Sequence, residues 1–261
     1  MTRFSSLLVL AAVGSAAIAL QAASPRSLDR NCYVSIGEKS GTFRLQTDNG
    51  DCHGHGNCGS NMSDLPFNRF TGINVSDFAN QGAHLIATLT SEAGSFTCTG
   101  TIREGELSGD AAFESHPDFV ARMEKMGFTG YDDEKLLAYT LFDIQSEWVR
   151  SLQQLGIRGM DSGNLISLRI FHVDSGFVHG LTSLGYEVPD ADKLVALSVQ
   201  GVNADEVRQI RALGYQPTLD QLVQIRIFRV TPEFIRSMQA RGFKNLTIDK
   251  LVQIRIFKLT D

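Results

Sequence analysis

Residue types that can do chemistry gather in one short polar segment, DCHGHGNC, at 51–58. Within it Cys52, His53, His55 and Cys58 supply two thiolates and two imidazoles, a ligand set that zinc favours. Their spacing matches no zinc finger or ribbon, and so short a loop is poorly suited to aiming all four groups inward. We therefore predict a disulfide between Cys52 and Cys58 and keep a zinc site as the alternative.

The chain contains four cysteines, all of them in the first hundred residues. An even number of cysteines in an exported chain favours disulfides, and four cysteines allow three connectivities. Beside the pair that would close the Gly-rich loop, we favour a disulfide between Cys32 and Cys98, which would tie two strands together.

Two Asp-Ser-Gly strings, at 161–163 and 174–176, repeat the sequence around the catalytic carboxylates of aspartic proteases. Each stands where a helix is predicted to begin, so capping of that helix by the Asp side chain explains both strings. His172 and His179 fall on different predicted helices. We interpret them as surface or packed histidines.

Motifs for a nucleophilic serine, a P-loop, a zinc protease and a dinucleotide site are missing from the sequence. We therefore predict a non-enzymatic protein without a cofactor. The alternative is a hydrolase or metal-binding protein whose site lies in the loops between residues 49 and 80. A net charge of −5 gives no reason to expect a nucleic acid partner, which would require a basic face.

Residues 1–23 are predicted to be a secretory signal peptide. Small residues follow the apolar run from Leu7 to Leu20. At about 1.5 Å per residue, that run is too short to cross a hydrocarbon core about 30 Å thick. We therefore expect a mature chain that begins near Ser24, lies outside the cytoplasm in the periplasm or medium, and has no stable membrane insertion.

Residues 24–115 are predicted to form a small antiparallel β domain that carries the disulfides. Runs of alternating residues, separated by Gly-containing turns, occur at 32–48, 84–91, 95–102 and 106–115. Together they predict a sheet of five or six strands.

Residues 116–261 contain an internal repeat. The heptapeptide LVQIRIF at 222–228 returns unchanged at 251–257, and looser copies begin at residues 136, 165 and 194. Glycines precede the copies at spacings of 29, 29, 29 and 28 residues, at Gly127, Gly156, Gly185, Gly214 and Gly242. A period of this length is typical of solenoids, which present surfaces more often than they do chemistry.

Each unit of about 29 residues is interpreted as a pair of short helices. At 231–242, Thr231 can cap a helix, Pro232 suits its first turn and Gly242 can end it. The partner helices are predicted to open at Asp133, Asp161, Asp190, Thr218 and Thr247. The sequence thus predicts an α+β protein, a β domain followed by an α-solenoid of helix pairs. Because LVALSVQGVN at 194–203 approximates a leucine-rich repeat, a βα solenoid is the alternative.

The segment TPEFIRSMQARG at 231–242, together with the LVQIRIF-type segments, resembles a known family of helical repeats. These GVTPEFIRELRALGY-type repeats occur in bacterial exported proteins and in the extracytoplasmic tails of BlaR1-like M56 sensor proteins. The likeness covers 116–261, and the stretch from 93 to 128 is similar to the β region that often precedes those repeats. The peptidase part with its H-E-x-x-H motif is absent here, so the resemblance implies the architecture and, by analogy, an interaction or sensing role.

Two surface features are predicted for the helices. Arg169, Arg226 and Arg255 occupy equivalent positions, which indicates either a site for an acidic partner or, as we favour, a solvated side. The last predicted helix, at 247–258, keeps the apolar pattern of the interior copies. We predict that it docks on a second copy or another protein through Leu251, Ile254, Ile256 and Phe257.

Overall fold

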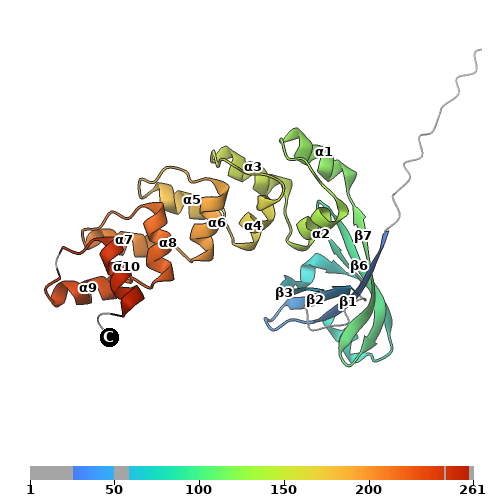
Figure 1. The fold of residues 1–261 in the computed structure, drawn as a ribbon. Helices are drawn as coiled ribbons and strands as arrows, with labels where there is room; N and C mark the ends of the chain where they lie inside the picture. Colours follow the sequence, from blue (N-terminus) through green and yellow to red (C-terminus); the bar gives the residue numbers. More distant parts are fainter. Residues whose placement is uncertain (1–25, 50–58, 244, 259–261) are drawn as a thin grey trace, which may run out of the picture.

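The N-terminal part of the molecule is one antiparallel sheet (Figure 1). The computed structural model describes residues 26–49, 59–243 and 245–258. In these ranges the strands are β1 (Arg26–Ile36), β2 (Thr42–Asn49), β3 (Gly59–Pro66), β4 (Phe70–Thr71), β5 (His84–Thr90), β6 (Gly94–Arg103) and β7 (Glu106–Ser115). Their order is β3-β2-β1-β7-β6-β5-β4. The sheet exceeds the five or six predicted strands because β3 and β4 both lie in the stretch 49–80, for which the sequence predicts loops. Strand β4, with two residues, is too short to show an alternating pattern.

The hairpin of β6 and β7 follows the sequence pattern closely. Every second residue of β6 is buried, from Gly94 to Ile102. Two residues with positive φ, Glu104 at 52° and Gly105 at 78°, join the strands and place Arg103 opposite Glu106. A two-residue turn of this kind matches the right-handed twist of paired strands.

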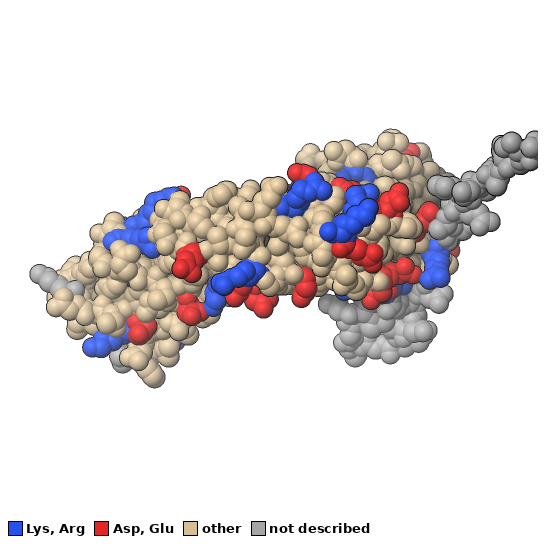
Figure 2. Space-filling model, turned by 90° about the horizontal axis from the view of Figure 1, so that it is seen from above, with Lys and Arg blue, Asp and Glu red and all other residues tan. Residues whose placement is uncertain are grey.

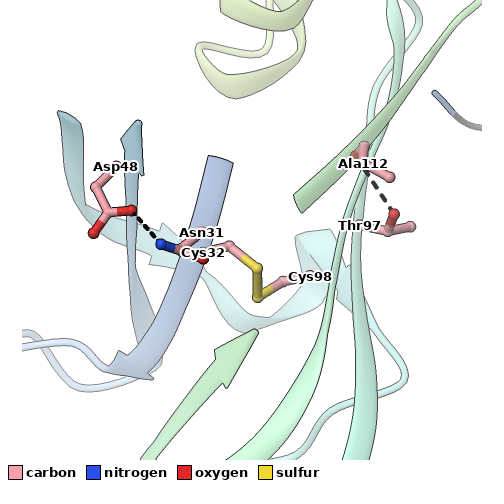
Figure 3. Close-up of a disulfide and its surroundings, with 6 residues drawn as sticks. All are labelled: Asn31, Cys32, Asp48, Thr97, Cys98 and Ala112. Atoms are coloured by element: carbon pink, nitrogen blue, oxygen red, sulfur yellow. Dashed lines mark hydrogen bonds between the residues drawn. A yellow bond between two sulfur atoms is a disulfide. The ribbon is translucent and has the colours of Figure 1, made fainter. Parts of the chain in front are cut away.

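The disulfide between Cys32 and Cys98 joins β1 to β6 and confirms that predicted pairing (Figure 3). Because β7 lies between these strands, the Cα atoms of Cys32 and Cys98 would be at least about 9.5 Å apart in a flat sheet. They are 5.8 Å apart, so the sheet bends sharply here into a nearly closed, barrel-like form. Gly109 of β7, opposite Cys32, permits this bend, since a Cβ there would lie 2.0 Å from the carbonyl oxygen of Thr99.

Ten short helices follow in the described part of the chain. They are α1 (Pro117–Lys125), α2 (Asp133–Leu141), α3 (Ser146–Gln154), α4 (Asn164–Ile170), α5 (Ser175–Thr182), α6 (Ala191–Val199), α7 (Ala204–Ala212), α8 (Leu219–Ile227), α9 (Pro232–Ala240) and α10 (Ile248–Phe257). We call α2, α4, α6, α8 and α10 the even helices and the others the odd helices. They lead away from the sheet in an elongated arrangement (Figure 1).

Most helix boundaries are set by the predicted residues. Side chains that accept a hydrogen bond from a backbone amide of the first turn include Asp174, Asp190, Thr218, Thr231 and Thr247. Each odd helix is followed by a glycine with positive φ, at Gly127, Gly156, Gly185, Gly214 and Gly242. Helix α2 begins at the predicted Asp133, whereas α4 begins at Asn164, three residues after the predicted Asp161.

Side chains also link helices across the repeat distance. Three even helices donate to a carbonyl at the C-terminal end of the preceding even helix: Arg169 to Phe142, Ser198 to Phe171 and Arg226 to Gln200. Odd helices do the same, through Gln153 to Met126, Arg211 to Leu184 and Gln239 to Leu213. These bonds satisfy carbonyl groups that a helix end leaves without an intrahelical partner.

The sheet and the first helices are packed together. Helix α2 lies against β5, β6 and β7, and its Tyr139 is fully buried. Glu92, between β5 and β6, accepts hydrogen bonds from the Ser146 hydroxyl of α3 at 2.6 Å and from Arg122 of α1 at 3.3 Å. Buried apolar side chains of sheet and helices form one continuous cluster.

The predicted α-solenoid is wrong: the structure is an α+β fold with an N-terminal sheet and ten helices that follow it. The helical part does not begin as a separate stack, because α2 is part of the packing on the sheet. The closest helix pairs are α4 with α6, α6 with α8, α8 with α10, α1 with α3 and α7 with α9. The leucine-rich-repeat alternative is also wrong, since the described residues after Ser115 contain no strand. A sequence period shows that helices carry similar residues, and it does not fix how they stack.

Among the described residues, no helix is both long and apolar enough to cross a membrane.

Candidate binding surface

The predicted Cys52–Cys58 disulfide and the alternative zinc set with His53 and His55 fall outside the described residues. So does the predicted signal peptide. Within the part of the chain that the structure describes, no group of three or more His, Cys, Asp or Glu side chains could hold a metal ion.

Both Asp-Ser-Gly strings stand at helix starts, and Asp174 caps α5 as predicted, whereas the N-cap of α4 is Gly163 instead of Asp161. Asp161 accepts hydrogen bonds from two backbone amides at 2.7 and 2.8 Å before α4, and Asp174 accepts one at 2.8 Å at the start of α5. His172 is exposed in the turn after α4, with φ of 55°, whereas His179 lies within α5.

Two hydroxyl contacts join residue types that act in catalysis. The Ser162 hydroxyl accepts from Lys135 Nζ at 3.1 Å, but its own proton is donated to the Thr129 carbonyl at 2.6 Å. Ser95 Oγ lies 3.3 Å from His116 Nε2 where the sheet meets α1. Neither hydroxyl lines the hollow described below.

An exposed row of apolar side chains marks the C-terminal ends of the even helices. Ile170, Val199, Ile227 and Ile256 occupy equivalent positions, spaced 29, 28 and 29 residues apart, and are 39–50% exposed. Phe171 and Phe257, next in sequence to two of them, are also exposed. We call these six residues the apolar stripe. Exposed apolar side chains gathered in this way mark binding surfaces more often than isolated ones do.

Leu141 of α2 holds the same position in its helix, yet only 6% of it is exposed. Strand β3 and the 3₁₀ helix η1 (Phe67–Arg69) lie beside this helix end. Arg69 of η1 donates to the carbonyls of Leu141 at 3.0 Å and Thr140 at 2.7 Å. The chain therefore covers the first position of the row with its own segment 62–69, and no described residue covers the next four to the same degree.

A hollow of about 470 Å³ opens where this cover stops. One wall comes from residues 62–69 of the sheet, and the other comes from the ends of α2 and α4. Its lining includes apolar Met62, Leu65, Pro66, Leu141 and Ile170 and the charged or titratable side chains of Asp64, Arg69, Asp143, Arg169 and His172. Because Ile170 belongs to both, the hollow is continuous with the apolar stripe.

Two guanidinium groups share one carboxylate in the hollow. Arg69 and Arg169 each lie 3.7 Å from a different oxygen of Asp143, beyond normal hydrogen-bond distance. Burial lowers the pKa of Arg69; Asp143 opposes this effect and Arg169 adds to it. Asp64 is paired with Lys39 at 2.8 Å. The arrangement can bind an anionic group and shows no nucleophile in position.

The equivalent arginines bind within the chain. Besides capping the preceding helix, Arg226 pairs with Glu206 at 2.7 Å, and Arg255 stacks on the Phe234 ring at 3.9 Å. Arg169 alone of the three lines the hollow, and its guanidinium carbon lies 5.5 Å from the centre of the Trp148 ring. Figure 2, a view of the molecule from above, shows acidic and basic side chains interleaved along it, without a single-sign patch on the face drawn.

The four residues predicted as an interface differ in accessibility. Leu251 is fully buried and Ile254 partly buried, so neither offers a whole side chain to a partner. Ile256 and Phe257 are 47% and 67% exposed and belong to the apolar stripe. The sequence did not predict the hollow, because Arg69 and Leu141 meet across 72 residues of chain.

Comparisons of the chain with protein-family models, with curated proteins and with solved structures find no match.

Proposed function

We propose that this chain is an exported, non-enzymatic interaction protein that binds an extended segment of a partner protein along the apolar stripe. The burial of Leu141 under the chain's own segment 62–69 carries this proposal. Within the described residues it is the one position of the row that is buried, and its cover is the end of β3 and the short helix η1. A partner segment of similar shape and apolar character would continue the same packing over the stripe.

The spacing of the stripe sets the spacing of the partner's side chains. Packed helices lie about 8–10 Å apart, so neighbouring stripe residues on successive even helices are separated by about that distance. A polyproline II segment repeats its side-chain direction every third residue, which is about 9.3 Å. The fitting partner is therefore an extended segment with an apolar residue at every third position.

Charge beside the stripe refines this description. His172, Arg229 and Lys258 are exposed, and each has φ of about 50° at the left-handed residue just past the end of α4, α8 or α10. The cationic groups of Arg229 and Lys258 beside an apolar row suit a partner with carboxylates between its apolar residues.

The location outside the cytoplasm belongs to the same proposal. The disulfide between Cys32 and Cys98 supports it, because such bonds persist in oxidising compartments. The likeness of the helical sequence to the tails of sensor proteins favours a sensing role for the interaction.

A displayed library of random dodecapeptides tests the stripe. Selection on the wild-type protein, with counter-selection on a Val199→Glu, Ile227→Glu variant, should enrich peptides with apolar residues at every third position. A circular dichroism spectrum and a melting curve would establish that the variant is folded. The proposal fails if no peptide is enriched over the folded variant, or if enriched peptides lack this spacing.

A further inference from the structure

We infer that the hollow between the sheet and α4 binds the C-terminal residue of a peptide, with its free carboxylate at Arg169 and its apolar side chain against Met62, Leu65 and Ile170. The inference rests on the proposed function for the rest of the partner, whose chain would leave the hollow along the apolar stripe.

The charges of the hollow favour an added carboxylate. Two guanidinium groups face one shared carboxylate, and neither is close enough to form a strong hydrogen bond with it. The second acid, Asp64, already has its own partner in Lys39. The lining carries two cations, Arg69 and Arg169, and two anions, Asp64 and Asp143. Because Lys39, outside the lining, pairs with Asp64, the two guanidinium groups are left with one carboxylate between them.

Arg169 is the cation available to a ligand. Its Nε donates to the Phe142 carbonyl at 3.0 Å, which fixes the guanidinium in place. About a third of its side chain is exposed, compared with 16% for Arg69. The two terminal nitrogens of Arg69 already donate hydrogen bonds to the Leu141 and Thr140 carbonyls. A carboxylate would thus bind Arg169 directly, and the more buried Arg69 would attract it through its positive charge without contacting it.

The apolar lining explains the choice of a C-terminal residue. Leu65 is buried, Met62 is partly buried and Ile170 is exposed, so both walls of the hollow place apolar side chains next to the charged groups. A C-terminal residue carries a carboxylate and an apolar side chain on one Cα, whereas internal Asp or Glu carries no apolar group of its own. The volume of about 470 Å³ falls within the range of small-ligand sites.

Trp148 provides the measurement, because it is the only tryptophan in the chain and lies under Arg169. Its fluorescence would be followed during titration of the purified protein with N-acetyl-Ala-Ala-Leu, as free acid and as C-terminal amide. The free acid should give a saturable change and bind at least about tenfold more tightly than the amide. Equal affinities, or no saturable change up to about 10 mM free acid, would overturn the inference.

Isovalerate, a small acid with the same branched group, separates two sources of the ligand. Weaker binding of isovalerate than of the tripeptide acid supports a peptide ligand. If isovalerate binds as tightly as the tripeptide acid, the inference of a peptide ligand is wrong, and the ligand of the hollow is a small carboxylic acid.

Three variants separate binding from folding. Arg169→Gln should weaken tripeptide binding by about tenfold or more, whereas Arg226→Gln, which removes the same helix-capping bond at α8, should leave it within about twofold. Asp143→Asn should tighten binding, because it removes the competing carboxylate and Asn tolerates the φ of 54° at this position. Weaker binding by Asp143→Asn, or equal losses in the two arginine variants, would contradict the site.

The two proposals can fail separately. If the tripeptide acid does not bind while library peptides still require Val199 and Ile227, only the hollow is wrong. If the tripeptide acid binds but no library peptide depends on the stripe, only the stripe is wrong.

Discussion

Equivalent residues of two even helices, one near the sheet and one farther along the chain, have different surroundings. Leu141 of α2 and Ile227 of α8 occupy the same helical position, yet they are 6% and 50% exposed. The two helices share their apolar pattern, so the difference comes from outside them: the sheet covers one, and no described residue covers the other to the same degree. The C-terminal ends of the even helices therefore suit a covering segment, and the described part of the chain buries only the first of them.

Loss of the disulfide should have the largest effect on stability, because this bond holds the bend that brings β1 close to β6. Replacing Cys32 and Cys98 by Ala should lower the free energy of unfolding by about 2–5 kcal/mol. Denaturant unfolding followed by circular dichroism measures this change, and hydrogen exchange at Leu141 should quicken as its cover loosens. An unchanged midpoint would mean that the sheet holds its bend without the cross-link.

Truncation of the covered and uncovered residues tests the comparison itself. Leu141→Ala should cost about 2–5 kcal/mol, because a buried side chain leaves a cavity. Ile227→Ala should cost about 0.5 kcal/mol or less, as for other surface positions. Equal costs in the same denaturation experiment would show that Ile227 is also covered in solution.

The sequence predicts the helix boundaries better than the packing of the helices or the hollow, because helix boundaries depend on interactions within a few residues of chain. Thr231, Pro232 and Gly242 mark a helix by side-chain and backbone preferences that act within a few residues, and their predictions are confirmed. The solenoid prediction failed because a period reports similar residues without fixing how α2 packs on the sheet. The hollow could not be predicted, because residues 62–69 and 141–172 meet only through that packing.

Replacing a glycine that follows an odd helix should lower stability less, because its effect is confined to the end of that helix. Gly185 has φ of 83° with no atom within 4 Å of an added Cβ, so Gly185→Val should cost about 1–2 kcal/mol through backbone strain alone. The control is Gly180→Ala inside α5, which should raise stability by about 0.5–1 kcal/mol. Melting shifts of the same sign in the two variants would contradict the left-handed role of Gly185.

The junction of sheet and helices should weaken in acid. Burial alone would raise the pKa of Glu92, but hydrogen bonds from Ser146 and Arg122 lower it below its usual value. A lowered pKa gives stability that is present above the unfolded pKa, about 4.3, and is lost as pH falls through the folded value. Glu92→Gln should flatten the dependence of melting temperature on pH below about 4.5, and Glu147→Gln, at an exposed pair, should not. Identical profiles for the two variants would exclude Glu92 as the titrating group.

The most direct test of the central claim is the affinity of a library-selected peptide for two variants of matched exposure. Ile227, at 50% exposed, lies in the stripe, whereas Ile86, at 52%, lies on β5 of the sheet. Fluorescence anisotropy should show at least about a tenfold loss of affinity for Ile227→Glu and a change within about twofold for Ile86→Glu. Equal losses, or a greater loss for Ile86→Glu, would contradict a binding surface on the even helices.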